Sequence, residues 1–477
     1  MILAIDQGTT GTTCLVVDDE LRVRGRGHCE IRQHFPRPGW VEHDPEELWT
    51  SVLAAAEVAL AAAGVSAGEL RAVGITNQRE TTLLWERRTG QPVHRAIVWQ
   101  DRRTAERCRE LPKELIRART GLVADPYFSA TKLEWLLAHT DVSVRDLAAG
   151  TVDSWLVWRL TGGREHVTDV TNASRTMLLD LAAGGWDDEL LELFGVDRSL
   201  LPRVAGSAEV VGEAELFSAA VPIAGIAGDQ QAALFGQGCW GPGQAKATYG
   251  TGTFVLVNVG SSEGRAPDGL LRTAAAAAPG EPGQFAVEGS VLVGGAALQW
   301  LRDGLGLLAS AAETAELARS VDSSGGVVFV PALTGLGSPW WDADARGLIS
   351  GLTRGTTRAQ LVRATLEAIA FQVADVVAAL PAGVEVLRAD GGASANTFLM
   401  QLQADVLGCP VEVAAEAETT ALGAAALAGL AVGVWPDLDA LGRLVRRGAR
   451  YEPGVDPAEL TALRADWSLA LRRALLH

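Results

Sequence analysis

The chain has 477 residues, 48% of them hydrophobic and 21% charged, a composition typical of a folded protein of roughly two to four domains and not of a single small binding module. Its 41 Lys and Arg residues against 58 Asp and Glu residues give a formal net charge of −17. Because this charge repels phosphate backbones and anionic lipid, we expect no nucleic-acid partner and no stable membrane insertion.

The cysteines and the start of the chain indicate a compartment. Five cysteines are scattered along the chain without a C-x-x-C pair: Cys14, Cys29, Cys108, Cys239 and Cys409. This pattern favours a reducing environment and does not predict structural zinc. The apolar start, Met1 to Ile5, is shorter than the hydrophobic core of a signal peptide. We therefore expect a cytoplasmic protein.

Strand and helix signals alternate from the first residues. The apolar runs 2–5 and 14–17 predict two strands, and the polar glycine turn from Asp6 to Thr13 joins them into a β-hairpin. A helix is predicted from about 45 to 63, followed by a strand over 72–76. This alternation is typical of a layered α/β architecture.

A second hairpin of the same pattern occurs near the middle of the chain. A strand-like segment over 245–249 and an apolar run over 254–257 flank the turn Gly250-Thr251-Gly252-Thr253. Self-similarity of this kind indicates two related halves.

The boundary between the halves is predicted at a glycine-rich stretch. Residues 236–243 contain four glycines and a proline, which is typical of a linker. We therefore expect domains over 1–241 and 242–477. Within the second half, Thr419 to Pro436 is rich in Ala and Gly and marginal in length for a membrane span, so it predicts a helix packed closely inside the protein.

Three common motifs are excluded. Gly64 to Gly68 satisfies G-x-S-x-G, but it follows a helix and precedes a strand, whereas a nucleophile elbow needs the opposite order. Gly236 to Gly241 satisfies G-x-G-x-x-G, yet no strand leads into it and Pro242 follows it. The sequence contains no G-x-x-x-x-G-K-[ST], so we expect no P-loop.

The two glycine/threonine turns are suited to polyphosphate. Glycine lets backbone N–H groups approach anionic oxygens, and threonine hydroxyls add donors without fixed charge, as in Gly8-Thr9-Thr10-Gly11 and Gly250-Thr251-Gly252. One such turn would be an ordinary hairpin, but a duplicated pair favours nucleotide binding. Asp6 would oppose phosphate unless it held a magnesium ion there. Alternatively, Asp6 only caps the turn.

Two further polar clusters follow predicted apolar runs. In Gly74 to Thr82, neighbouring Arg79 and Glu80 can donate to and accept from adjacent hydroxyls, which suits a small neutral polyol. The alternative is a surface ion pair of little energetic value. In Ile226 to Ala233, Asp229 opens an Ala-rich helix and is either a helix N-cap or the general base for a hydroxyl proton.

These clusters and others resemble a known family. The matching segments are Asp6 to Thr10, Gly74 to Thr82, Ala96 to Arg103, Asp125 to Lys132, Gly228 to Gln231 and Asp390 to Ala393. Their order and spacing are similar to those of the FGGY carbohydrate kinases, and Asn77 to Thr81 with the paired glutamines after Asp229 resembles the glycerol-phosphorylating branch. The resemblance covers most of the chain.

The resemblance implies a fold and an activity. The fold is two actin-like (ribonuclease H-like) α/β domains with a ligand cleft between them, and the activity is ATP-dependent phosphorylation of glycerol to sn-glycerol 3-phosphate with MgATP as the donor. Most catalysis would then come from positioning and charge neutralisation, with Asp229 as general base and Asp6 on Mg²⁺. The resemblance also implies a homo-oligomer, a dimer or tetramer.

The remaining ligand contacts come from the same resemblance. It places glycerol on Arg79, Glu80, Trp99, Tyr127, Asp229, Gln230 and Phe254. It places ATP on Thr9, Thr10, Gly11, Thr251, Gly295, Gln299, Gly392 and Asn396. From the residues alone, Trp99 and Phe254 would be core aromatics and Gln299 an exposed helix residue.

Two departures from the family pattern predict differences in phosphate contact and in regulation. Many members place an Arg at the end of the first turn, where this chain has Thr13, so a charged phosphate contact is not expected there. Some bacterial members carry an Arg-containing loop for inhibition by fructose 1,6-bisphosphate, whereas 216–220 contains no Arg, and we expect no such inhibition.

Two alternative functions stay open at this point. One is a kinase for another polyol or ketose on the same scaffold. The other is a nucleotide-gated binding protein that uses actin-like domains without phosphorylating a small molecule.

Overall fold

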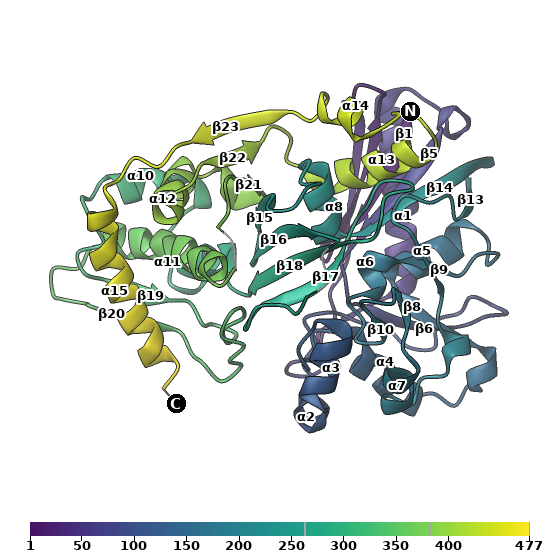
Figure 1. The fold of residues 1–477 in the computed structure, drawn as a ribbon, viewed down its shortest axis with the longest axis horizontal. Coiled ribbons are helices and arrows are strands. Elements are labelled where there is room, and N and C mark those ends of the chain that lie inside the picture. The colour runs from purple at the N-terminus through teal and green to yellow at the C-terminus, as the bar shows by residue number, and fades with distance from the viewer. Residues whose placement is uncertain (262–263, 381–382, 477) are drawn as a thin grey trace.

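Two mixed β-sheets, one in each half of the chain, organise the fold (Figure 1). The computed structural model describes residues 1–261, 264–380 and 383–476. The first sheet has the order β13 (Gly212–Leu216), β14 (Ala219–Gly228), β5 (Ala72–Asn77), β1 (Ile2–Gln7), β2 (Gly11–Val17) and β3 (Val23–Glu30). The second has the order β17 (Leu271–Ala275), β18 (Gln284–Val291), β16 (Thr253–Gly260), β15 (Ala245–Tyr249), β21 (Leu387–Asp390), β22 (Val411–Ala414) and β23 (Arg447–Tyr451). The predicted two-domain α/β class is confirmed.

Helices cover both sheets, and shorter strands extend the first half. The helices are α1 (Pro45–Ala63), α2 (Ala105–Glu110), α3 (Lys113–Thr120), α4 (Ser129–Ala138), α5 (Val152–Leu160), α6 (Val170–Ala173), α7 (Asp188–Leu193), α8 (Asp229–Gly236), α9 (Gly295–Gln299), α10 (Thr314–Arg319), α11 (Arg358–Ala378), α12 (Thr397–Leu407), α13 (Thr419–Ala431), α14 (Leu438–Gly442) and α15 (Pro457–Ala474). A four-stranded sheet has the order β4 (Glu42–His43), β7 (Ala96–Ile97), β6 (Thr82–Glu86) and β8 (Leu147–Thr151). Two-stranded pairs join β9 (Val167–Asp169) to β12 (Arg203–Ala205), β10 (Leu179–Asp180) to β11 (Gly185–Trp186), and β19 (Val328–Val330) to β20 (Leu348–Ser350).

Both predicted hairpins are present. Strands β1 and β2 pair antiparallel, and the Gly8 amide donates to the Gly11 carbonyl at 2.9 Å across the turn. Strands β15 and β16 pair in the same way, with the Gly250 amide donating to the Gly252 carbonyl at 2.9 Å. Helix α1 has the predicted bounds, because the Asp44 side chain caps its start and Gly64 ends it in a left-handed conformation. The two turns therefore occupy equivalent places in the two sheets.

Helix α13 belongs to the second half of the sequence but packs on the first sheet. It lies against β1, β5 and β14 and beside α8, where Figure 1 shows it in yellow-green over the purple strands. The approach is so close that a Cβ added at Gly74 would lie 2.2 Å from the Ala424 carbonyl oxygen, and one at Gly423 would lie 1.9 Å from that of Ala232. The prediction of a closely packed small-residue helix is confirmed. Among the described residues, no helix combines the length and apolarity that crossing a bilayer requires.

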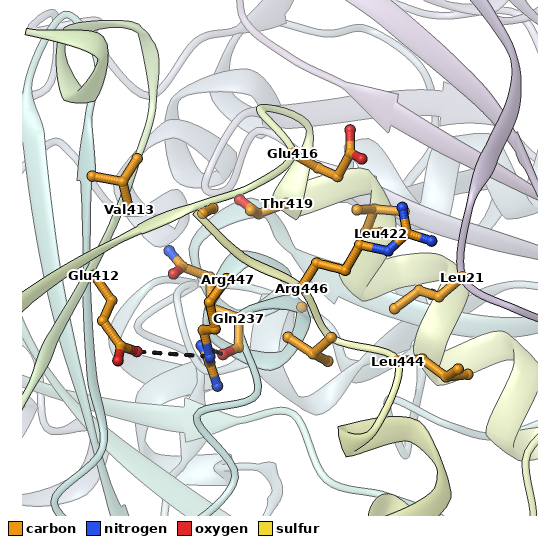
Figure 2. A pocket seen from close by; sticks show the side chains of 13 residues that line it. Leu21, Gln237, Glu412, Val413, Glu416, Thr419, Leu422, Leu444, Arg446 and Arg447 are labelled. Atoms are coloured by element: carbon orange, nitrogen blue, oxygen red, sulfur yellow. Dashed lines mark hydrogen bonds and ion pairs between the residues drawn. The ribbon is translucent and has the colours of Figure 1, made fainter. Parts of the chain in front are cut away.

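Segments that pass between the two sheets meet around Gln237, directly after α8. Its carbonyl accepts from Arg388 at 2.7 Å and from Arg447 at 3.0 Å, and its side-chain amide donates to Asp390 at 2.7 Å. Figure 2 shows the small pocket beside it, about 30 Å³, together with the ion pair of 3.7 Å between Arg447 and Glu412. These bonds fix β21 and β23 of the second sheet against the end of α8.

We predict that Gly423→Ala destabilises the protein. The new methyl group would meet backbone atoms of α8, which cannot rotate away, and overpacking of this kind costs about 1–3 kcal/mol. The midpoint of thermal unfolding measures the effect. Gly283→Ala is the matched control, because nothing lies within 4 Å of a Cβ at Gly283. Equal midpoints for the two variants would contradict the packing argument.

Candidate active site

Three parallel strands of the first sheet bring the predicted polar clusters to one edge. Strand β5 pairs parallel to β1 on one side and to β14 on the other. The register sets Gln7 opposite Asn77 and Asn77 opposite Gly228, so all three strands end side by side. Ligands of open α/β sheets bind outside such carboxyl ends. The turn after β1, the cluster after β5 and the start of α8 therefore meet at a common site.

Arg79 and Glu80 lie inside the protein and not on its surface. Their side chains are 1% and 2% exposed, so the alternative of a surface ion pair is wrong. The Arg79 Nη2 donates to the Tyr127 hydroxyl at 3.3 Å, and its Nε lies 3.2 Å from Asp229 Oδ1. Its Nη1 also donates to the Gln231 side chain at 3.2 Å. The guanidinium thus links two of the other predicted glycerol-binding residues, Tyr127 and Asp229.

A carboxylate from the second sheet pairs with Arg79. Glu288 on β18 accepts from Arg79 through both of its oxygens, at 2.5 and 3.1 Å, and from Arg175 at 2.9 Å. Arg175 in turn donates to Glu80 at 2.7 Å. Burial alone would raise the pKa of Glu288, but Arg175 and Arg79 outweigh it and lower that pKa to about 2. Two cations and two anions therefore form a closed, buried network across the two domains.

The backbone of Glu80 is held in a left-handed conformation, with φ of 60°, which is uncommon for a residue with a side chain. Its carbonyl oxygen accepts from Thr82 at 3.0 Å, from Ser129 at 3.1 Å and from the Lys132 ammonium at 3.1 Å. The same ammonium donates to the Tyr127 carbonyl at 2.6 Å. Lys132 is fully buried and so positions Glu80 and Tyr127 relative to each other.

Asp229 occupies the first position of α8, and Gly228 precedes it as the N-cap, so the N-cap alternative for Asp229 is wrong. Its Oδ1 accepts from the Gln230 backbone amide at 2.8 Å, and its Oδ2 from the Gln230 side chain at 3.1 Å. The side chain is 31% exposed, whereas Arg79 beside it is buried. Asp229 is thus an oriented carboxylate that is open to a ligand.

Aromatic side chains stand between the two domains. The ring of Trp99 lies edge-on to Tyr127 at 5.6 Å and to Phe254 at 6.4 Å between ring centres. Trp99 and Tyr127 line a cavity of about 740 Å³ whose other wall includes Thr251 and Gly252 from the second domain. This cavity connects the polyol-binding residues predicted in the first domain to the second phosphate turn.

The first turn reaches the same cavity through Trp99. The indole Nε1 donates to the Thr9 hydroxyl at 2.9 Å. Thr10 is exposed, and Gly11 packs so tightly that a Cβ there would lie 2.7 Å from the His28 ring. The Thr13 hydroxyl, at the position where many family members have an Arg, makes a 3.0 Å hydrogen bond with His28.

Glycines bring three segments of the second domain together. The Gly295 amide donates to the Gly250 carbonyl at 2.9 Å, and the Gly294 amide to the Thr251 carbonyl at 2.9 Å. A Cβ at Gly391 would lie 2.7 Å from the Tyr249 carbonyl oxygen, so only glycine allows the loop 390–393 to approach this turn. Thr251, Gly295 and Gly392 are therefore gathered at one end of the second sheet.

Two of the predicted ATP-binding residues lie at the edge of this group. Gln299 is exposed at the end of α9, as the residues alone indicate. Asn396 caps α12, accepting from the Phe398 and Leu399 amides at 3.0 Å each and donating to Thr314 at 2.9 Å. The oxygen and the NH₂ group of the Asn396 side chain are therefore both hydrogen-bonded within the protein. Asn396 was not predicted from the sequence as a helix cap.

Asp6 fits a magnesium ion held with phosphate. If Asp6 only capped the turn, its carboxylate would accept a hydrogen bond from the turn. In the part of the chain that the structure describes, this carboxylate makes no hydrogen bond and no ion pair. Burial, followed by the negative charges of Asp229 and Glu418, raises the pKa of Asp6 well above its usual value. A cation at this position would relieve that repulsion. No described group of three or more His, Cys, Asp or Glu residues could hold a metal by itself, so nucleotide and water would supply the other ligands.

Sequence reasoning missed four buried charges at the site: Arg175, Glu288, Lys132 and Lys246. Glu288 is the one charged residue of β18, and Lys246 is the one charged residue of β15. A charged side chain in the middle of a buried strand needs a partner, and this signal was available from the sequence.

We predict that Glu288→Gln destabilises the fold by about 3–5 kcal/mol, because it leaves Arg79 and Arg175 buried without their shared anion. Urea unfolding at neutral pH measures the loss. Glu281→Gln, on the exposed loop before the same strand, is the control. The stability that ionised Glu288 contributes is present above pH 4.5 and is lost as pH falls toward 2. A variant as stable as the control would contradict the role given to this network.

Comparison with known proteins covers both halves of the chain. A model of the N-terminal domain of the FGGY family of carbohydrate kinases matches residues 1–236, and a model of the family's C-terminal domain matches residues 245–432. The glycerol kinase of Leptothrix cholodnii is 54% identical over 493 aligned residues, which cover 99% of each chain.

Solved structures show the same relationship. The glycerol kinase of Plasmodium falciparum with ADP superposes with a TM-score of 0.92 at 34% identity, covering 100% of this chain and 98% of that one. A xylulose kinase from Rhodospirillum rubrum superposes with a TM-score of 0.84 at 27% identity, covering 98% of this chain and 97% of that one. Both domains and nearly the full length are accounted for, and the chain belongs to the FGGY family of carbohydrate kinases.

Proposed function

We propose that this protein is a glycerol kinase that transfers the γ-phosphoryl group of MgATP to glycerol and releases sn-glycerol 3-phosphate and ADP. One observation carries the proposal: Arg79, Glu80 and Asp229 converge at parallel strand ends, and Arg79 contacts Tyr127, which lines a cavity together with the phosphate turn of the other domain. The similarity to glycerol kinases over the full length supports glycerol as the substrate.

The polar network suits a small neutral polyol. Arg79 is a donor only, whereas the carboxylates of Glu80 and Asp229 are acceptors, so adjacent hydroxyls can find both kinds of partner. Since Arg79, Arg175, Glu80 and Glu288 neutralise one another, an uncharged substrate adds no unpaired charge. Trp99 and Phe254 provide apolar walls for the carbon backbone.

Asp229 is the proposed general base. It takes the proton from a terminal hydroxyl as that oxygen forms a bond to the γ-phosphorus and the bond from this phosphorus to the β,γ-bridging oxygen breaks, releasing ADP. The Arg79 Nε and the Gln230 amides hold its two oxygens in place. Positioning of this kind supplies most of the rate in phosphoryl transfer.

The nucleotide is assigned to the two glycine turns and the segments gathered around them. Thr9, Thr10 and Gly11 from the first domain and Thr251, Gly295, Gln299, Gly392 and Asn396 from the second are its proposed contacts. Mg²⁺, held at Asp6, supplies charge neutralisation of the phosphate oxygens when bound. When the two domains close on the cavity, they exclude water from the phosphoryl transfer.

Asp229→Asn is expected to lower kcat by about 10²- to 10⁴-fold while changing KM for glycerol less, because an amide cannot accept the proton. A coupled assay of ADP release measures both constants. Asp141→Asn on an exposed loop should leave them unchanged. Turnover of the Asp229 variant near that of the wild type would show that another group is the base.

A substrate panel separates the remaining alternatives. The similarity to a xylulose kinase favours a ketose as the second candidate. Glycerol is expected to have the highest kcat/KM when it is compared with dihydroxyacetone, erythritol, xylulose and ribulose. A preference for a ketose would contradict glycerol as the substrate, and ATP turnover that no polyol accelerates would favour the binding-protein alternative.

We predict that fructose 1,6-bisphosphate does not inhibit this protein. The hairpin of β13 and β14 turns through Phe217 and Ser218, and residues 212–223 contain two glutamates and no Lys or Arg. A sugar bisphosphate needs cationic partners, which this hairpin lacks. Assays of glycerol phosphorylation with millimolar bisphosphate test this, and a falling rate would contradict it.

Three further expectations remain predictions. The five cysteines are free thiols, which supports a reducing cytoplasm as the site of action. Assembly into a homo-oligomer and a domain boundary at residue 242 rest on the family resemblance and the linker composition.

A further inference from the structure

Lys246 is a buried cation that the reaction described above leaves without a role. It lies on β15, where Ala245, Ala247 and Tyr249 face the core of the second domain. Side chains alternate along a strand, so Lys246 and Thr248 point to the opposite side. The residue is 0% exposed. Within the part of the chain that the structure describes, no carboxylate forms an ion pair with it.

The partners of Lys246 connect it to the base. Its ammonium donates to the Gln230 side-chain oxygen and, at 2.8 Å, to the Thr248 hydroxyl. An ammonium is a donor only, so the oxygen of the Gln230 amide must face Lys246 and the NH₂ group must face away. That NH₂ group donates to Asp229 Oδ2 at 3.1 Å. The cation thus determines that Asp229 receives a donor at this oxygen.

We propose that Lys246 is a positioning residue for phosphoryl transfer: acting from the second domain, it fixes the Gln230 amide, which in turn holds Asp229 in its catalytic orientation. This inference rests on the proposed function, since it assigns how the base of that reaction is held.

A purely structural role does not explain this lysine. An ammonium with only neutral hydrogen-bond partners is costly to bury, and an apolar side chain would fill the space at a lower cost. Without the ammonium, the two ends of the Gln230 amide have nearly the same shape, so the amide can turn and present its oxygen to Asp229. Two facing oxygens repel, and the carboxylate would move.

The protonation state of Lys246 gives the inference a pH signature. Burial lowers the pKa of Lys246 to about 8, while Asp390 on β21, Asp229 on α8 and Glu288 on β18 favour the proton and Arg79 opposes it. The Cys239 thiol also lies near. Above this pH the neutral amine can accept as well as donate, so it no longer fixes the amide. Activity should therefore fall on the alkaline side.

A double-mutant cycle tests the connection. The variants are Lys246→Met, Gln230→Ala and the pair together, with Lys113→Met at an exposed position as the control. We expect Lys246→Met to lower kcat for glycerol by about 10²-fold with KM for MgATP little changed. If Lys246 acts through Gln230, the double variant loses no more than the worse single variant. Additive losses, or a kcat for Lys246→Met equal to that of the control, would overturn the inference.

Two further measurements do not depend on that cycle. Gln230→Glu keeps an acceptor for Lys246 but removes the donor to Asp229, so it is expected to lose kcat even if Lys246→Met does not fold. In the wild type, kcat/KM for glycerol should fall near pH 8, and Lys246→Met should lack this limb. If the fall in kcat/KM near pH 8 were the same in the wild type and in Lys246→Met, this inference would be overturned, while the proposed function would stand. A wild type that does not phosphorylate glycerol would overturn the proposed function and this inference together.

Discussion

The pairing of Arg79 with Glu288 is the interaction on which the rest of the site depends. Arg79 is buried at the carboxyl end of a strand in the first sheet, where a lone guanidinium would be very costly. The second sheet supplies the compensating carboxylate through both of its oxygens. Glu288 also neutralises Arg175, which holds Glu80. The proposed polyol-binding residues of one domain are therefore oriented by a side chain of the other.

The proposed general base also depends on side chains of both domains. Asp229 belongs to the first domain, but Gln230, which holds it, contacts Lys246 of the second. The proposed site therefore needs side chains of both domains: Arg79 and Asp229 come from the first, and Glu288 and Lys246 from the second. The close packing of α13 on the first sheet and the hydrogen bonds of Gln237 hold the two halves of the chain together. In the proposed function, backbone amides, threonine hydroxyls and a metal ion would meet the phosphates without a basic surface, which would let a protein of strongly negative charge bind a nucleotide.

Local features of this protein were readily predicted from sequence, and long-range pairings were not. Apolar runs and glycine turns predicted both hairpins, and the Ala- and Gly-rich composition of 419–436 predicted a closely packed helix, because these depend on neighbouring residues. Arg79, Glu80 and Asp229 stood out as polar residues directly after strands. Glu288 and Lys246 were not assigned a role. The partners of Glu288 lie 209 and 113 residues away in sequence, and the contact of Lys246 with Gln230 depends on how α8 packs against β15. The proposed walls formed by Trp99 and Phe254 followed only from the family resemblance. The N-cap alternative for Asp229 was wrong because Gly228 caps α8, and glycine also serves as an N-cap.

The central claim is that glycerol binds where the two domains meet, with a terminal hydroxyl directed at Asp229 and at the last phosphate of the nucleotide. A crystal structure of the protein with glycerol and a non-hydrolysable ATP analogue tests it most directly. The account predicts glycerol within hydrogen-bond distance of Arg79, Glu80 and Asp229, and the terminal phosphate facing the hydroxyl nearest Asp229. Glycerol bound away from these three side chains, or a terminal phosphate directed elsewhere, would contradict it.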